Sequence, residues 1–226
     1  MKIVIFEPHP DDLLFGVGHI IFDWIEEGHD ISIITVTDGR ACYREMKDSL
    51  TNEAKTMTED EVAQMRLNEA KEAVEFLGIP REKHFLLEFH DAEGQKYVND
   101  AIERVKPLIK DADIIVLPSD NNAHIDHQAT HDIAVKAAQK LNLKDAKFWV
   151  YFIPSYGKFK DDSKGKQREI EISEDLQEKL LDWLKIYQSQ KKLKFTWKMY
   201  NRFLRVVNTR KLGEFEYQDI GKYYNF

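Results

Sequence analysis

The sequence has one cysteine and no long apolar run, and each of these absences excludes a class of protein. Cys42 is the only cysteine among 226 residues, so the chain forms no internal disulfide and no zinc cluster built on several thiolates. Any metal site must therefore use histidine, aspartate or glutamate. No stretch of about 18 apolar residues occurs, and the apolar start of the chain is too short for a signal peptide. These features predict a cytoplasmic protein without a membrane span.

Basic residues are outnumbered by acidic ones. The chain holds 33 Lys and Arg against 40 Asp and Glu, which gives a formal net charge of -7. Nucleic acids and anionic membranes attract basic surfaces, so this balance argues against a general binder of either. The balance does not exclude a local basic pocket.

The length of the chain suits one α/β domain. The hydrophobic fraction of 42% and the charged fraction of 32% are those of a globular protein that is somewhat rich in charge. We predict a single domain over residues 1–226, with a core at 1–153 and a helical, aromatic-rich extension at 154–226.

Short apolar segments alternate with segments of helical periodicity, which is the pattern of βαβ units. The segments predicted as strands are 2–6, 31–37, 85–89, 113–117 and 148–153. The segments predicted as helices are 16–27, 61–77, 99–110, 125–141 and 173–190, and 159–167 is a charged loop. The polar stretch at 38–59 is either a loop over a site or a loop that contains a short helix. The fold class is therefore α/β, a Rossmann-like three-layer α/β/α arrangement around a mostly parallel sheet with strand order 3-2-1-4-5.

Polar clusters follow the first and the fourth predicted strands. His9, Asp11 and Asp12 come directly after the first strand, and the sequence PSDNNAHIDHQATH occupies 118–131 after the fourth. In a sheet of this order the two strands are neighbours across the topological switch point, where ligands bind outside the carboxyl ends of the strands. We therefore expect the two clusters to meet and to form the active site.

The residue types in the clusters suit a catalytic metal. Two imidazoles and one carboxylate leave an open coordination position on a zinc-type ion. The adjacent Asp11 and Asp12 should point in different directions, so one could ligate the ion and the other could address a water molecule. Asp126, between His124 and His127, could fix the tautomer of an imidazole.

The two clusters resemble the motifs of the LmbE-like deacetylases, the family that includes N-acetylglucosaminyl-phosphatidylinositol de-N-acetylase. The HPDD motif of that family stands here at 9–12 and its HxDH motif at 124–127. Weaker similarities are Thr-Asp-Gly at 37–39 and the pair Arg66 and Glu69. The resemblance covers most of residues 1–153 and does not cover the tail from residue 154.

The resemblance implies an activity and a role for each residue of the motifs. The activity is removal of an acetyl group from an N-acetylglucosamine-type sugar or sugar conjugate by water activated on Zn²⁺ or another divalent metal. His9, Asp12 and His127 would hold the metal, Asp11 would act as the general base, and His124 would stabilise the oxyanion.

Residues outside the metal set are assigned less directly. Asp126 would hold His124 in its charged form. Arg66 and Asp91 would contact the substrate by weak resemblance, and Arg40, in the loop after the second strand, could bind a sugar or phosphate group. Leu13 departs from the family, which usually has Glu directly after HPDD.

Other interpretations remain open. A lone Asp-Asp pair more often forms a turn and a helix N-cap, and His124 with His127 could simply begin a helix. We expect His131 to be solvated or supporting, and His19 to be structural. Alternative functions are hydrolysis of another amide, an ester or a phosphoester, or a catalytically silent sugar- or metal-binding protein. The tail aromatics would pack in the core or form a homo-oligomer contact; they are Trp197, Tyr200, Phe203, Tyr223 and Tyr224.

Overall fold

The strands of the protein form one sheet. The computed structural model describes residues 1–154, 158–159 and 166–221, and within them the strands are β1 (Lys2–Glu7), β2 (Asp30–Thr37), β3 (His84–Phe89), β4 (Ile114–Pro118), β5 (Lys147–Tyr151), β6 (Lys166–Glu171) and β7 (Thr209–Glu216). Their order in the sheet is β3-β2-β1-β4-β5-β7-β6. The predicted order of the first five strands is confirmed.

The first five strands are parallel, and the last two are not. In β1, Ile5 lies opposite Ile33 of β2 and Val116 of β4, so both neighbours run in the same direction as β1. β7 pairs antiparallel with β5 and with β6. The sequence analysis did not predict β6 or β7, because charged residues interrupt the apolar pattern of both segments. The C-terminal extension thus supplies two strands of the main sheet.

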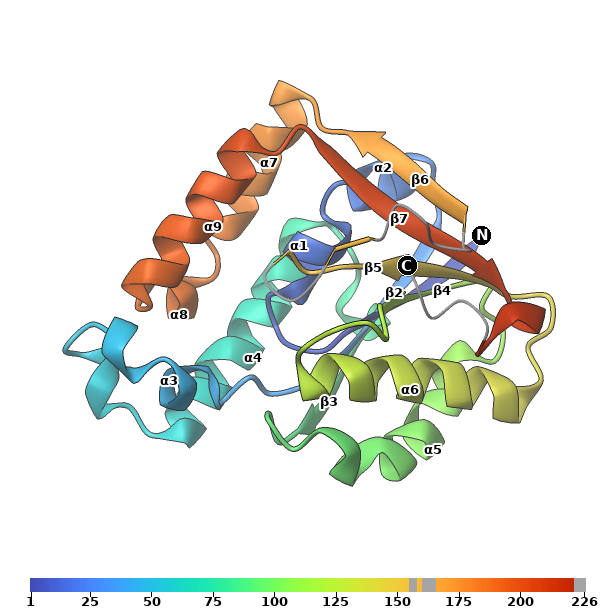
Figure 1. The fold of residues 1–226 in the computed structure, drawn as a ribbon, viewed down its shortest axis with the longest axis horizontal. Helices are drawn as coiled ribbons and strands as arrows, with labels where there is room; N and C mark the ends of the chain where they lie inside the picture. Colours follow the sequence, from blue (N-terminus) through green and yellow to red (C-terminus); the bar gives the residue numbers. More distant parts are fainter. Residues whose placement is uncertain (155–157, 160–165, 222–226) are drawn as a thin grey trace.

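Helices cover both faces of the sheet (Figure 1). They are α1 (Asp12–Val17), α2 (Ile21–Glu26), α3 (Cys42–Glu45), α4 (Glu59–Phe76), α5 (Val98–Ile109), α6 (Ile125–Leu141), α7 (Glu174–Leu184), α8 (Gln188–Lys191) and α9 (Lys194–Val206). α5 and α6 pack on one face, and α1, α2, α4, α7 and α9 pack on the other. None of the described helices is both long and apolar enough to cross a membrane.

Alternate residues of the central strands enter two separate cores. In β1, Ile3 and Ile5 belong to the core beneath α1 and α7, whereas Val4 and Phe6 belong to the core beneath α5 and α6. All four side chains are fully buried. A parallel sheet covered on both faces requires such continuous apolar strands, and their polar continuations can then emerge only at the strand ends.

The predicted helix at 16–27 is wrong in its extent. The chain forms two short helices there, and the first begins at Asp12. The first helix ends at Val17, and Ile20, with φ -141° outside the helical region, is the N-cap of the second. A Cβ at Gly18 would overlap the backbone oxygen of Leu14, so this position requires glycine.

Other predicted segments differ in detail. The polar loop at 38–59 contains the short helix α3, as one of its two interpretations allowed, and the helix predicted at 173–190 is divided into α7 and α8. Most of the charged loop predicted at 159–167 lies outside the described residues, as do Tyr223 and Tyr224. Trp197, Tyr200 and Phe203 pack against the core, as expected of tail aromatics.

We predict that Gly16→Ala destabilises the protein. An added Cβ would lie 2.6 Å from two ring carbons of Tyr151, and this ring is held because its hydroxyl donates to the carbonyl of Phe6 at 2.7 Å. Overpacking of this kind costs about 1–3 kcal/mol of the unfolding free energy, measurable by urea denaturation.

The matched control is the same substitution in a Tyr151→Ala background. There the added methyl meets a cavity, so Gly16→Ala should cost much less. Equal losses in both backgrounds would contradict the contact.

Candidate metal centre

The two predicted clusters meet at the carboxyl ends of β1 and β4. His9 and Asp12 lie in the turn from β1 into α1, and His127 lies in the first turn of α6, which follows β4. The exposed fractions of the three residues are 7%, 4% and 0%. The pairing of β1 with β4 brings together residues that are more than a hundred positions apart.

One oxygen atom is the centre of this group. Asp12 Oδ2 lies 3.0 Å from His9 Nδ1 and 3.1 Å from His127 Nε2, and it also accepts a hydrogen bond from the backbone N–H of His9 at 3.0 Å. The three potential ligand atoms lie within 4.8 Å of one another. Nitrogen and oxygen ligands sit about 2.0–2.2 Å from zinc, so the group is close to the spacing that a shared ion requires.

The charges around the group also suit a cation. Asp11, Asp12, Asp91 and Asp126 are all buried, with exposed fractions of 6% or less. Buried like charges are costly unless a cation offsets them. The donor set of two imidazoles and one carboxylate, within this negative surround, therefore fits a divalent metal.

The titration behaviour of Asp12 and His9 follows from this surround. Burial alone would raise the pKa of Asp12, but His127 and His9 hold that pKa far below its usual range. Burial alone would lower the pKa of His9, but Asp91, Asp12 and Asp126 raise it well above the ordinary value. In the metal-free protein, a proton on His9 therefore supplies positive charge that a metal ion could supply instead.

The second nitrogen of His9 faces other carboxylates. Nε2 lies 3.1 Å from Asp91 Oδ1 and 3.4 Å from Asp126 Oδ2. A proton on Nε2 satisfies these oxygens and leaves Nδ1 for an ion, which is the usual arrangement of a carboxylate-oriented histidine ligand. Asp91 Oδ2 also accepts from the N–H of Ala41 at 2.9 Å.

Asp126 anchors the loop before α5. Its carboxylate is fully buried and accepts hydrogen bonds from the Tyr97 hydroxyl at 2.7 Å, from Ala92 N–H at 2.7 Å and from Gly94 N–H at 2.8 Å. It lies 3.8 Å from His124 Nδ1. Asp126 is therefore shared among many partners, and His124 is the most distant of them.

His124 caps α6. Its Nδ1 accepts a hydrogen bond from the backbone N–H of Asp126 at 3.2 Å, so the proton of the neutral ring lies on Nε2. Burial lowers the pKa of His124 to about 4, and the neighbouring His9 and His127 lower it further. This differs from the expectation that Asp126 holds His124 charged; the metal-free protein has a neutral His124 that can still donate through Nε2.

Asp11 lies beside the three clustered ligands and pairs with Arg66. The Arg66 guanidinium donates to Asp11 Oδ1 at 2.5 Å. Burial raises the pKa of Asp11 although Arg66 opposes the shift. Gly39, with φ +68°, lets the guanidinium approach, because a Cβ there would overlap it. Asp11 takes the N-cap position of α1 but makes no capping hydrogen bond with its side chain.

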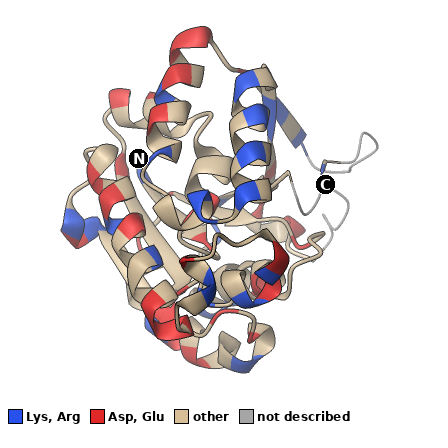
Figure 2. Cartoon of the chain, turned by 90° about the vertical axis from the view of Figure 1, so that its left-hand side faces the viewer, with Lys and Arg blue, Asp and Glu red and all other residues tan. Residues whose placement is uncertain are grey.

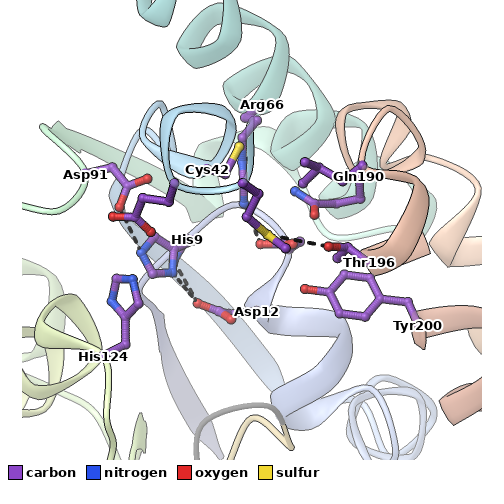
Figure 3. A pocket seen from close by; sticks show the side chains of 13 residues that line it. His9, Asp12, Cys42, Arg66, Asp91, His124, Gln190, Thr196 and Tyr200 are labelled. Carbon is purple, nitrogen blue, oxygen red and sulfur yellow. Dashed lines mark hydrogen bonds and ion pairs between the residues drawn. The ribbon is translucent and has the colours of Figure 1, made fainter. Parts of the chain in front are cut away.

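These residues open into a pocket of about 490 Å³, including its open mouth (Figure 3). The residues that line it are His9, Asp11, Asp12, Cys42, Glu45, Met46, Arg66, Asp91, His124, Gln190, Leu193, Thr196 and Tyr200. The sequence analysis did not assign the last four to the site. They come from α8, from α9 and from Leu193 directly before α9, where the sequence shows only helical periodicity.

Several predicted residues lie elsewhere or have other surroundings. Arg40 does not line this pocket, since its guanidinium donates to Asp38 at 2.7 Å and to Asp60 at 2.8 Å. His131 is buried and its Nδ1 lies 2.9 Å from the Pro118 carbonyl, so it is a supporting residue and not a solvated one. Burial raises the pKa of Cys42, which keeps its thiol protonated.

Leu13, where the family usually has Glu, has a buried carboxylate beside it. Glu7 Oε2 accepts from the backbone N–H of Leu13 at 3.0 Å, and Thr35 Oγ1 donates to Glu7 Oε1 at 2.6 Å. Burial raises the pKa of Glu7 to about 8. The Leu13 side chain itself packs in the core.

Fold and site together define a class of protein. The chain is a three-layer α/β protein with a buried His/Asp centre, suited to a divalent metal, at the switch point of its sheet. A family model described as "PIG-L: GlcNAc-PI de-N-acetylase" matches residues 4–138, which is more than half of the chain. The protein belongs to this family.

Individual relatives are more distant. Diacetylchitobiose deacetylase of Thermococcus kodakarensis is 29% identical over 141 residues, which cover 60% of this chain and 48% of the relative, so the chain spans about half of that protein. The solved N,N'-diacetylchitobiose deacetylase of Pyrococcus horikoshii superimposes with a TM-score of 0.73 at 20% identity, over 97% of this chain and 85% of that one. The 4-carboxy-2-hydroxymuconate hydratase of Pseudomonas putida has the same fold, with a TM-score of 0.67 at 15% identity over 94% and 95% of the two chains.

We predict that Glu7→Gln stabilises the metal-free protein at high pH. Between pH 4.5, the ordinary pKa of Glu, and about 8 the native state binds a proton that the unfolded chain has lost, so wild-type stability falls as pH rises. Glutamine does not titrate and keeps an acceptor for Leu13.

The measurement is urea unfolding in chelator at pH 5 and at pH 9. Relative to wild type, the unfolding free energy of the variant should rise by about 2–4 kcal/mol across this range, at about 1.4 kcal/mol per pKa unit. Glu72→Gln, on the exposed face of α4, is the control. If the unfolding free energy of the wild type does not fall from pH 5 to pH 9 relative to that of Glu7→Gln, a raised pKa of Glu7 is contradicted.

Proposed function

We propose that the protein is a metal-dependent N-deacetylase that hydrolyses the acetamide of an N-acetylated sugar or sugar conjugate. The convergence of His9, Asp12 and His127 beside Asp11, at a pocket that opens to solvent, is the observation that supports this most directly. Family membership and the named activities of the relatives agree with it. We further propose that the enzyme acts in the cytoplasm and that residues 1–226 work as one unit.

His9, Asp12 and His127 would hold Zn²⁺ or another divalent ion. Such an ion would supply Lewis acidity, polarising a carbonyl oxygen and lowering the pKa of water. Asp91 and Asp126 would keep His9 in the tautomer that presents Nδ1 to the ion.

The chain's own residues would move the protons. Asp11, with a pKa raised by burial, would accept a proton from the attacking water. His124 would donate a hydrogen bond from its Nε2–H to the carbonyl oxygen as negative charge develops there, and would keep its proton. Asp11 would then return a proton to the departing amine, and Arg66 would hold Asp11 in place throughout.

Two substitutions test separate parts of this mechanism. Asp11→Asn should lower kcat/KM by at least about 100-fold, the usual contribution of a general base, with metal content unchanged. His127→Asn should lose both metal and activity. The control is Asp145→Asn, at an exposed position away from the site.

The measurements are metal per chain after dialysis, thermal unfolding, and amine release from N-acetylglucosamine and N,N'-diacetylchitobiose. An Asp11→Asn enzyme with near wild-type turnover would remove Asp11 from its role, and full metal retention in His127→Asn would remove His127 from the ligand set. If the metal-loaded wild type releases phosphate or an alcohol from p-nitrophenyl esters but no amine, the deacetylase assignment is wrong.

A further inference from the structure

The C-terminal segment supplies one wall of the pocket. Gln190, Thr196 and Tyr200 face His9 and Asp91 across it (Figure 3). All three lie beyond residue 138, outside the part of the chain that the family model matches. The wall therefore comes from the C-terminal segment and not from the residues that the family model matches.

Hydrogen bonds from the family core fix this wall. Glu69 of α4 accepts from the backbone N–H of Ser189 at 2.6 Å and from its hydroxyl at 2.5 Å. The Tyr43 hydroxyl donates to the Ser189 carbonyl at 2.9 Å. Because Gln190 follows Ser189 directly, its backbone position is held from two sides.

Two buried donors in the pocket lack acceptors. Gln190 is 2% exposed and no described residue accepts from its Nε2; the same holds for Nε of Arg66, which is 4% exposed. Buried amide and guanidinium N–H groups are almost always hydrogen-bonded, so a donor left open in a pocket indicates a ligand atom. Both residues line the same space.

The charge of the lining limits what the ligand can be. Asp11, Asp12, Asp91 and Glu45 face the pocket, and the positive charge that opposes them is the Arg66 guanidinium and the cation of the metal centre. A phosphate or carboxylate would meet like charges there. A neutral molecule with several hydroxyl groups meets no such repulsion and supplies acceptors for both open donors.

We propose that Gln190 is a specificity-determining residue whose amide donates to a ring hydroxyl of a neutral sugar bound between the metal centre and α9. The proposal rests on the proposed function, and it identifies a ring hydroxyl as the part of the substrate that the C-terminal segment contacts. Thr196 and Tyr200 extend the same wall beyond Gln190.

The first test is Gln190→Leu, with Gln188→Leu as a matched control at an exposed position on the same short helix. Loss of one neutral hydrogen bond should raise KM for N-acetylglucosamine about three- to tenfold and leave kcat unchanged. The control should match wild type in both.

A merely structural effect is distinguished with the monodeoxy analogues of N-acetylglucosamine. The wild type should have a higher KM for the one analogue that lacks the hydroxyl bound by Gln190 than for the parent sugar. Gln190→Leu should have equal KM values for that analogue and the parent sugar. If the KM difference between each analogue and the parent sugar is the same in Gln190→Leu as in the wild type, the proposal is overturned while the deacetylase assignment stands. A wild type that releases amine from no sugar overturns both.

A second observation concerns the outer faces of α7 and α9, which lie side by side (Figure 1). Residues 183–213 contain nine Lys and Arg and no Asp or Glu, whereas residues 1–182 carry 23 basic against 37 acidic residues. Four exposed cations lie on one face of α9; they are Lys194, Lys198, Arg202 and Arg205. In Figure 2, Lys and Arg recur along this helix, beside a helix that carries Asp and Glu.

α7 presents the opposite charge at the same spacing. Glu174, Glu178 and Asp182 are exposed at intervals of four residues, as Lys194, Lys198 and Arg202 are on α9. Among the described residues, no carboxylate pairs with these α9 cations. The acidic stripe on α7 and the basic stripe on α9 therefore lie side by side, and their charges are largely unpaired with one another.

Exposed apolar side chains border the basic stripe. Phe195, Met199 and Val206 are 67%, 37% and 67% exposed. An anionic membrane or a nucleic acid would be attracted to α9 but repelled by the acidic α7 beside it. A second copy turned by a two-fold axis along the helices would place each basic stripe on an acidic one and cover the apolar residues.

We infer that the α7–α9 face is a self-complementary interface between two copies of this chain. Sedimentation velocity should show a dimer of the metal-loaded wild type that weakens at high salt. A chain with Lys198→Glu and Arg202→Glu should be monomeric, as should a chain with Glu174→Lys and Glu178→Lys.

Mixing these two variants should restore the dimer, because each altered stripe then faces its complement on the other chain. A monomeric wild type, or a dimer that neither variant disrupts, overturns the inference. If the mixed variants do not associate, the inference is also overturned. That result would be expected if the face bound a membrane, a nucleic acid or another protein, because such a partner would not join the two variants.

Discussion

The negative charge buried at the carboxyl ends of β1 and β4 determines which charges the rest of the site must supply. Asp12 Oδ2 lies within 3.1 Å of one nitrogen from each of two histidines, and Asp91 and Asp126 approach the far side of the His9 ring. Such a cluster is stable only if a cation balances it. A proton on His9 does so in the metal-free protein, and a divalent ion would do so while leaving a position open for chemistry.

The backbone of the first loop explains how two adjacent aspartates serve different partners. α1 begins at Asp12, so Asp11 is the last non-helical residue and the two side chains leave the chain in different directions. Asp12 turns toward the histidines and Asp11 toward Arg66 of α4. The Glu7 carboxylate holds the start of the same helix from below, through the Leu13 N–H.

The C-terminal segment ties the sheet to the pocket. β6 and β7 extend the sheet beyond β5, and the helices that connect them to the site bring Gln190 and Tyr200 opposite His9. Glu69 and Tyr43 fasten this segment to the part of the chain that the family shares. The metal centre thus comes from the residues that the family model matches, and the wall opposite comes from the C-terminal segment; variation of such a wall is one way in which a fold can host different substrates.

The sequence by itself determined the order of the five parallel strands and the two clusters at their ends, because apolar strands and the topology of βαβ units follow local and general rules. It also named His9, Asp12, His127, Asp11 and Arg66, which the structure brings together. Only the tertiary structure decided that Arg40 turns away to Asp38, that burial lowers the pKa of His124, and that α8 and α9 close the pocket. These features depend on which distant groups share a buried space, and residue spacing along a chain carries no record of that.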